Sequence, residues 1–137
     1  MSAPPLVADW QRVTHRLLAA LDAATSDLHL TPGETNALAC FGSDRERTVR
    51  ELLAASGQRP STLTGVLDRL ERRRLVERRP NRADRRSLTV SLTPAGAAAA
   101  GRVAVAFAAL EQELGAHART ARRALEAWDA VLTPRVR

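Results

Sequence analysis

The fold of this chain is decided by residues 59–93, which read RPSTLTGVLDRLERRRLVERRPNRADRRSLTVSLT. The first part predicts a helix, because its apolar residues recur at helical spacing and would all face the core. These residues are Leu63, Val66, Leu67 and Leu70. Two short strands follow, at Val76–Arg79 and Leu88–Thr93, and a polar tip joins them as a hairpin.

Charge is concentrated in the same stretch. It holds ten basic and four acidic residues, a surplus of +6 that equals the net charge of the whole 137-residue protein. The other residues balance, with eleven basic and eleven acidic side chains. A surplus confined to one supersecondary unit indicates a surface that meets a polyanion.

The helix also presents a polar side opposite its apolar stripe. Hydroxyl groups and a glycine come early and arginines one or two turns later, as in a helix that reads the major groove of DNA. The residues on or beside this polar side are Ser61, Thr62, Thr64, Gly65, Asp68, Arg69 and Arg72. The alternative interpretation is an ordinary solvated helix face.

The hairpin tip favours the DNA interpretation. It carries Arg82, Arg85 and Arg86 between turn-forming residues. Like charges clustered on a hairpin add little to its stability, so an anionic partner outside the chain explains them better. Phosphates or a minor groove beside a docked helix would supply that partner.

Capping signals place the helices before this stretch. An amphipathic helix is expected from Leu6 to about Asp27. Thr31-Pro32-Gly33-Glu34 is a capping box that opens a helix to about Phe41, and 42–47 is expected to be a polar turn. Thr48-Val49-Arg50-Glu51 opens another helix to Ala55. The tight turn 56–58 then makes a helix-turn-helix with the helix that starts near Pro60.

Two helices are expected after the hairpin. Thr93-Pro94 caps a long helix from Ala95 to about Ala116, which is apolar over much of its circumference. A last helix covers about Thr120 to Leu132, and Pro134 ends it.

Composition limits the class of protein. One domain is expected at this length, and scarce aromatic residues favour packed helices over a large sheet. The single cysteine, Cys40, excludes an internal disulfide. With neither a signal peptide nor a long apolar run, the sequence predicts a soluble, cytoplasmic protein with no membrane contact.

The stretch resembles the MarR family of winged-helix transcription regulators. Asp84-x-Arg86-x-x-x-Val90-x-Leu92-Thr93 is similar to the wing signature of the family. Ser61-Thr62-Leu63-Thr64 and Leu67-Asp68-Arg69-Leu70-Glu71 resemble its recognition helix, and Leu75-Val76-Glu77-Arg78 its first wing strand. The similarity covers roughly Leu30 to Gly96.

The resemblance implies a mainly α protein with a small β-wing, in which residues 1–137 form one MarR-like domain. Residues 31–93 would be the winged helix-turn-helix lobe, with dimerisation helices at 6–29 and 94–133. A homodimer would bind a palindromic operator in double-stranded DNA, most simply as a repressor. The residues expected to bind DNA are Arg59, Ser61, Thr62, Thr64, Asp68, Arg69, Arg72, Arg82, Asp84, Arg85 and Arg86. Asp84 would orient the wing or Arg86, which would enter the minor groove.

One position departs from the family. Glycine is usual between the recognition helix and the wing, where this chain has Arg74. A left-handed cap there would cost a non-glycine residue about 1 kcal/mol. Either this helix ends differently or Arg74 accepts the strain.

Other sites and assemblies remain open. A monomer whose terminal helices complete its own core is the alternative to the dimer. The three histidines and Cys40 have no metal-ligand spacing, so no metal is expected, and no catalytic motif is present. Cys40 is interpreted as a buried hydrophobe, against the reactive cysteine of some relatives.

A regulator is expected to have no cofactor, but the resemblance implies a small aromatic effector of unidentified chemistry. Trp10, His15, Arg16 and Phe41 could line its cleft. The alternative function is a winged-helix module that docks an acidic partner protein. Such a surface would carry apolar anchors where this helix has hydroxyl groups.

Overall fold

The computed structural model describes residues 3–134. It is mainly helical with one small antiparallel sheet, as the sequence predicts. The helices are α1 (Leu6–Ala24), α2 (Pro32–Ala39), α3 (Val49–Ser56), α4 (Pro60–Arg72), α5 (Pro94–Leu114) and α6 (Ala118–Leu132), with 3-10 turns at Ser26–Leu28 and Gly115–His117. The strands are β1 (Glu46–Thr48), β2 (Val76–Pro80) and β3 (Leu88–Leu92). Cα packing divides the chain into two compact units, one ending at Ala106 and the other beginning at Phe107.

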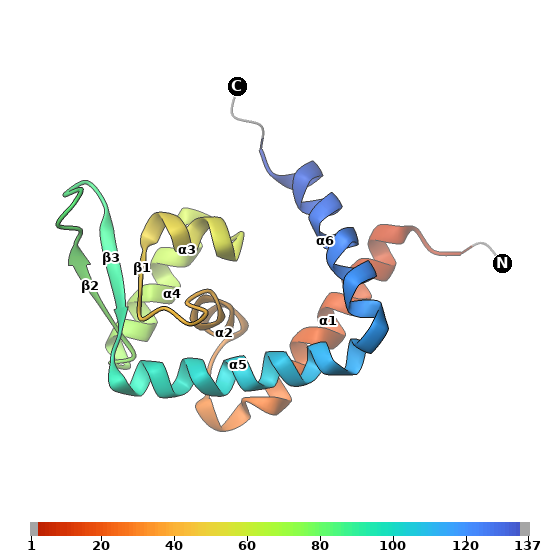
Figure 1. The fold of residues 1–137 in the computed structure, drawn as a ribbon, viewed down its shortest axis with the longest axis horizontal. Coiled ribbons are helices and arrows are strands. Elements are labelled where there is room, and N and C mark those ends of the chain that lie inside the picture. The colour runs from red at the N-terminus through yellow and green to blue at the C-terminus, as the bar shows by residue number, and fades with distance from the viewer. Residues whose placement is uncertain (1–2, 135–137) are drawn as a thin grey trace. The chain divides into compact units, whose positions relative to one another are not determined.

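The core of the first unit lies between α2, α3, α4 and the sheet (Figure 1). The predicted stripe of α4 is completely inside it, because none of its four side chains is more than 1% exposed. The other largest buried side chains are Leu38, Phe41, Leu52, Val76, Val90 and Val103. Packing of this kind fixes the polar side of α4 outward.

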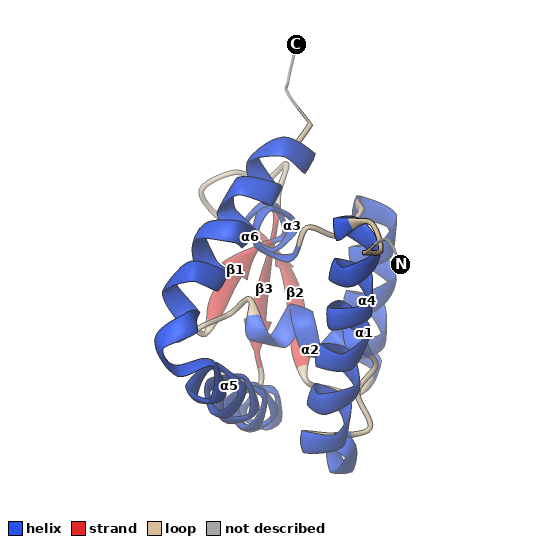
Figure 2. Ribbon diagram, turned by 90° about the vertical axis from the view of Figure 1, so that its right-hand side faces the viewer, coloured by secondary structure: helices blue, strands red, loops and turns tan. Residues whose placement is uncertain are grey.

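The sheet has the order β1-β3-β2, so β3 is central (Figure 2). Val76 pairs with Leu92 and Pro80 with Leu88, which makes β2 and β3 the predicted wing. The sequence analysis missed β1, which was expected to be part of a polar turn. Glu46 pairs with Ser91 of β3, and the Ser91 hydroxyl donates a 2.8 Å hydrogen bond to the Glu46 carboxylate. This strand exists through its partner, since its own three residues carry no apolar alternation.

Helix ends agree with the capping signals. Thr31 and Thr48 each accept a hydrogen bond from the backbone N–H of the glutamate three residues on, and each glutamate caps the threonine N–H in return. Several boundaries shift by a few residues: α1 ends at Ala24, where a 3-10 turn replaces its expected last residues, and α2 ends at Ala39. The two C-terminal helices meet at the 3-10 turn 115–117, so α6 begins at Ala118.

Exposed apolar side chains mark the terminal helices. On α1 only Leu21 is buried, and on α6 no residue is. Within residues 3–134, no helix has both the length and the apolar character required to cross a bilayer. The same residues contain no cluster of three His, Cys, Asp or Glu side chains suited to a metal ion.

Candidate nucleic-acid interface

The start of α4 is exposed, as a reading helix requires. Gly57 ends α3 in the left-handed conformation, and Pro60 occupies the first turn of α4 after Arg59 at the N-cap. The side chains of Ser61 and Thr62 are exposed beyond this turn. No described residue of the first unit covers them, so the predicted reading surface is open to a partner.

Thr64 is exposed too, but its hydroxyl is already engaged. Its Oγ1 donates a 2.9 Å hydrogen bond to the carbonyl of Pro60 one turn earlier. The hydroxyl proton therefore serves the helix, and the oxygen keeps lone pairs that can accept from a base amino group. A role for Thr64 in DNA recognition stays a prediction.

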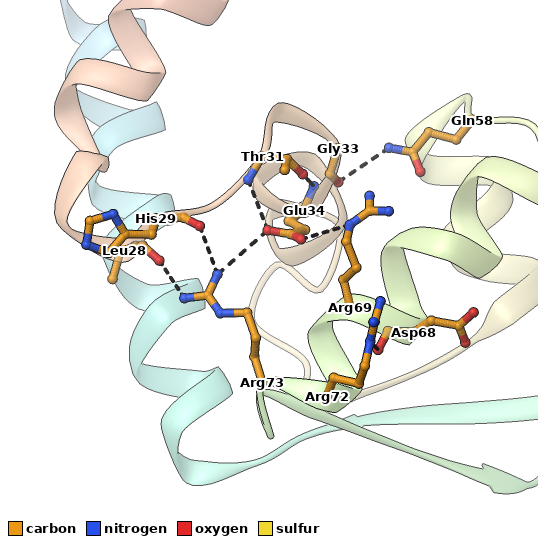
Figure 3. A network of polar contacts seen from close by, with 10 residues as sticks. All are labelled: Leu28, His29, Thr31, Gly33, Glu34, Gln58, Asp68, Arg69, Arg72 and Arg73. Carbon is orange, nitrogen blue, oxygen red and sulfur yellow. Dashed lines mark hydrogen bonds and ion pairs between the residues drawn. The ribbon is translucent and has the colours of Figure 1, made fainter.

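A buried carboxylate holds one flank of α4 (Figure 3). Glu34 lies at the start of α2, where it also caps Thr31, and its side chain is only 4% exposed. The Arg69 Nε donates to Glu34 Oε1 at 3.1 Å, and an Arg73 terminal nitrogen lies 3.7 Å from Oε2. Arg69, expected to contact DNA, thus uses one edge of its guanidinium inside the protein and remains 44% exposed.

Arg73 extends this flank to the segment before α2. Its two terminal nitrogens donate to the carbonyls of Leu28 and His29, at 2.6 and 3.0 Å (Figure 3). His29 itself has a left-handed backbone with φ 51°. The planar fork of arginine suits two adjacent carbonyls, so Arg73 fixes the end of α4 against the α1–α2 connection.

An arginine of the wing holds the opposite flank. Arg78 of β2 places one terminal nitrogen 2.6 Å from Asp68 Oδ1 and 2.6 Å from Glu71 Oε2. Its Nε and its backbone N–H also donate to Glu71, at 3.0 and 3.1 Å. These bonds hold the pKa of Glu71 below its ordinary value, mainly through the Arg78 side chain. Asp68, another predicted DNA contact, is therefore neutralised by the wing.

Arg72 differs from Arg69 in its ion pairing. Arg72 is exposed on the side of α4 opposite the core, and its Nε donates to the carbonyl of Asp68 at 3.4 Å. Its charge is not matched by a carboxylate in the hydrogen bonds and ion pairs of the described residues. Among the arginines of α4, Arg72 is the most available to an external anion.

The wing tip is organised by its own side chains. Asn81 Oδ1 accepts from the N–H of Ala83, and Asp84 Oδ1 accepts from the N–H of Arg86, each at 3.0 Å. Ser87 closes the turn through its N–H to the carbonyl of Asp84. Asp84 thus shapes the backbone at Arg86, while Arg82, Arg85 and Arg86 are exposed. In these Asx turns the Asn81 and Asp84 side chains bind backbone N–H groups, so they shape the tip and do not form ion pairs with its arginines.

Arg74 accepts the left-handed cap that glycine would adopt more readily. Its φ is 58°, its N–H donates to the carbonyl of Glu71, and the next N–H, of Leu75, donates to Leu70. This is a Schellman motif. Of the two alternatives raised by the sequence, the helix therefore keeps the left-handed cap, and the chain carries the strain at Arg74.

Glu34, Arg73 and Arg78 were missed as parts of this surface by the sequence analysis. Their partners lie 7 to 45 residues away along the chain, beyond any local pattern. The sequence did contain one signal for Arg78, because this arginine stands in the motif Leu75-Val76-Glu77-Arg78, shortly after two acidic residues of α4.

Cys40 is half-buried, and burial raises the pKa of its thiol above the ordinary 9.0, which disfavours a reactive thiolate. Of the proposed effector contacts, Phe41 is fully buried while His15 and Arg16 are exposed.

Comparison with known proteins points to one family. The model of the MarR family matches residues 30–88. MarR from E. coli, in its apo form, has 26% identity and a TM-score of 0.66, covering 98% of this chain and 100% of that one. The transcriptional repressor CouR bound to a 23-mer DNA duplex has 26% identity and a TM-score of 0.71, covering 95% and 93%. BpsR of Bordetella bronchiseptica, described with a mechanism for regulation of its DNA binding by 6-hydroxynicotinic acid, has 23% identity and a TM-score of 0.73, covering 91% and 98%. A search of curated proteins found no match.

Proposed function

We propose that the protein is a transcription regulator of the MarR type that binds double-stranded DNA, and the match of residues 30–88 to the model of the MarR family supports this proposal. The observation that carries the proposal is the exposure of unpaired arginines and hydroxyl groups along one segment. Arg72 on α4 and Arg82, Arg85 and Arg86 on the wing are exposed, and Ser61 and Thr62 lie open at the helix start. Arginines would neutralise phosphates, while the hydroxyl groups would contact base edges.

We further propose that the regulator acts as a homodimer. On α1, Leu6, Val7, Val13 and Leu17 are 65%, 53%, 58% and 47% exposed. On α6, Leu125, Val131 and Leu132 are 54%, 76% and 70% exposed. A second copy of the chain would bury these helices, and a two-fold assembly suits a palindromic operator. Repression, by covering a promoter, is the simplest action of such a dimer.

A small aromatic acid is proposed as the effector. A hollow of about 540 Å³ lies among the α1–α2 connection, the end of α4 and the start of α5, which is a suitable size for such a ligand. Leu28, Leu30 and Leu75 supply apolar surface. Arg73 and Arg102 also line the hollow, where Arg102 is paired with Asp27 at 2.8 Å, so an acid would have to compete with that carboxylate. Hydroxybenzoates that raise the melting temperature and weaken DNA binding would support this part of the proposal; a panel without effect on either would contradict it.

The experiment that tests the function is a gel shift with random duplex at low salt, followed by selection of bound fragments from genomic DNA. Binding that weakens steeply with salt, together with enrichment of palindromic fragments, is the expected result. Sedimentation should give twice the 14.9 kDa of the chain. Absence of any shift at low salt would instead favour a module that docks an acidic protein.

A further inference from the structure

The middle of α4 contains a glycine that nothing inside the protein requires. Gly65 lies on the polar side of the helix, one turn after Ser61 and Thr62. Glycine in a helix interior costs stability relative to alanine, so its presence calls for a reason. The reason is usually a left-handed backbone or a close neighbour.

Neither reason applies at Gly65. The residue is helical and is absent from the positive-φ glycines, which are Gly42, Gly57 and Gly115. A Cβ added at Gly65 would meet Arg69 Nη1 at 3.6 Å, an ordinary van der Waals distance from a flexible side chain. By contrast, a Cβ at Gly33 would lie 3.1 Å from Val66 of α4, and one at Gly96 would lie 1.8 Å from the Leu75 carbonyl oxygen. Those two glycines have a packing role within the chain, and Gly65 does not.

The surroundings of Gly65 indicate what needs the space. Asp68 is held on one flank of α4 by Arg78, and Arg69 is held on the other by Glu34 while its Nη1 lies 3.6 Å from the position of a Cβ at Gly65. Ser61, also on the polar side, is small. The absence of a side chain at Gly65 therefore leaves a shallow point on the polar side of α4, bordered by the guanidinium of Arg69.

We propose that Gly65 is a specificity-determining residue, the point at which the backbone of α4 approaches the base edges of a DNA duplex too closely for a side chain. The proposal rests on the proposed DNA-binding function and deepens it, since it assigns the depth at which α4 enters the major groove. A methyl group at Gly65 would separate the helix from the bases and weaken the contacts made by its neighbours. Phosphate contacts from the wing would be retained, because they belong to another element.

The test uses Gly65→Ala and Gly65→Val, with the full chain and a labelled duplex that the wild-type protein has selected from a random-sequence pool. Gly65→Ala should raise the melting temperature by about 2–4 °C, because alanine favours the helix. The same variant should bind the selected duplex about tenfold more weakly and lose most of its preference over random duplex. Gly65→Val should bind more weakly still.

Opposite changes in stability and affinity distinguish this role from a structural one. Gly101→Ala is the matched control, because Gly101 is an exposed glycine of α5 with no neighbour within 4 Å of an added Cβ. It should raise the melting temperature similarly and leave DNA affinity unchanged. Unchanged affinity in Gly65→Ala, or a lower melting temperature, would overturn the inference while leaving the regulator intact. A wild-type chain that binds no duplex at low salt would instead overturn the proposed function, and this inference with it.

Discussion

The guanidinium of Arg78 lies 2.6 Å from the carboxylate of Asp68, so the first wing strand neutralises an acidic residue of α4. The same guanidinium is 2.6 Å from Glu71. On the other flank the polarity is reversed, because Glu34 of α2 binds Arg69 of α4. Ion pairs therefore hold α4 on both flanks: α4 contributes an arginine to the pair with α2 and carboxylates to the pairs with β2. These pairs set both the orientation of α4 and the charge that it presents.

Replacement of Arg78 should weaken DNA binding although its side chain is mostly turned inward. Arg78→Met would leave Asp68 and Glu71 unpaired where phosphates are expected, and we expect about a tenfold loss of affinity for any duplex at moderate salt. Fluorescence anisotropy titration measures this loss. Arg79→Met is the control, because it changes the net charge equally on the same strand, and Arg79 is 76% exposed with Glu77 of that strand as its ion-pair partner.

Neutralising the two acidic residues should restore binding if the explanation is electrostatic. The triple variant Arg78→Met, Asp68→Asn, Glu71→Gln should recover most of the lost affinity. Equal losses in Arg78→Met and Arg79→Met would show that any wing cation has the same effect, and the specific role of Arg78 would be wrong.

Acid should weaken the link between wing and helix through Glu71. Arg78 lowers the pKa of Glu71 in the folded state below its ordinary 4.5, so the pair stabilises the fold above that pH. The contribution is lost as the pH falls through the depressed folded pKa. Urea unfolding from pH 6 to about pH 3 should therefore show a steeper loss of stability in the wild type than in Arg78→Met. The difference will be modest, since the Glu71 side chain is 38% exposed and water screens the pair.

Glu34→Gln separates the charge of Glu34 from its capping role. Glutamine can still cap Thr31, so the substitution removes chiefly the charged contacts with Arg69 and Arg73. We expect a loss of about 1–2 kcal/mol in the free energy of unfolding, limited because the two arginines remain partly in water. Urea denaturation measures it, and the control is Glu51→Gln, which makes the same change in the other capping box, at an exposed site on α3. A similar loss in both variants would assign the effect to capping.

Arg74→Gly should stabilise the protein. The backbone at Arg74 is left-handed, with φ 58°, and its side chain is exposed. Glycine would relieve a strain of about 1 kcal/mol, so the free energy of unfolding should rise by about that amount. Arg72→Gly, two residues earlier in helical backbone, should have the opposite effect of about −1 kcal/mol. A decrease in stability for Arg74→Gly would mean that the arginine side chain outweighs the strain.

Local signals in the sequence predicted much of the fold. Both capping boxes depend on residues three apart, and the buried stripe of α4 repeats every three to four residues, so short-range rules were sufficient. The resemblance to the MarR family, and not a local rule, indicated that Arg74 stands where glycine is usual, and it left open whether the helix would end differently or Arg74 would accept the strain. The structure shows the second outcome.

Long-range pairing could not be predicted in this way. β1 forms because Glu46–Thr48 finds the open edge of β3 more than 40 residues later. Arg69 and Asp68 were expected to face DNA alone, yet Glu34 and Arg78 approach them only after α2 and β2 have folded against α4. Charge counting could not say which charges cancel within the predicted surface. Arg72 and the wing arginines are what remains, which is why the final prediction concerns the wing.

Arg86→Ala should reduce the salt dependence of DNA binding. Arg86 is exposed, and Asp84 accepts a hydrogen bond from its backbone N–H, so the side chain is presented without disturbing the turn. If it neutralises one phosphate, its removal should lower the slope of log K against log salt by about one unit, on selected and random duplexes alike. Arg119→Ala on α6 changes the net charge equally and should leave the slope unchanged. Anisotropy titrations at several salt concentrations measure both slopes, and an unaltered slope for Arg86→Ala would remove this residue from the DNA contact.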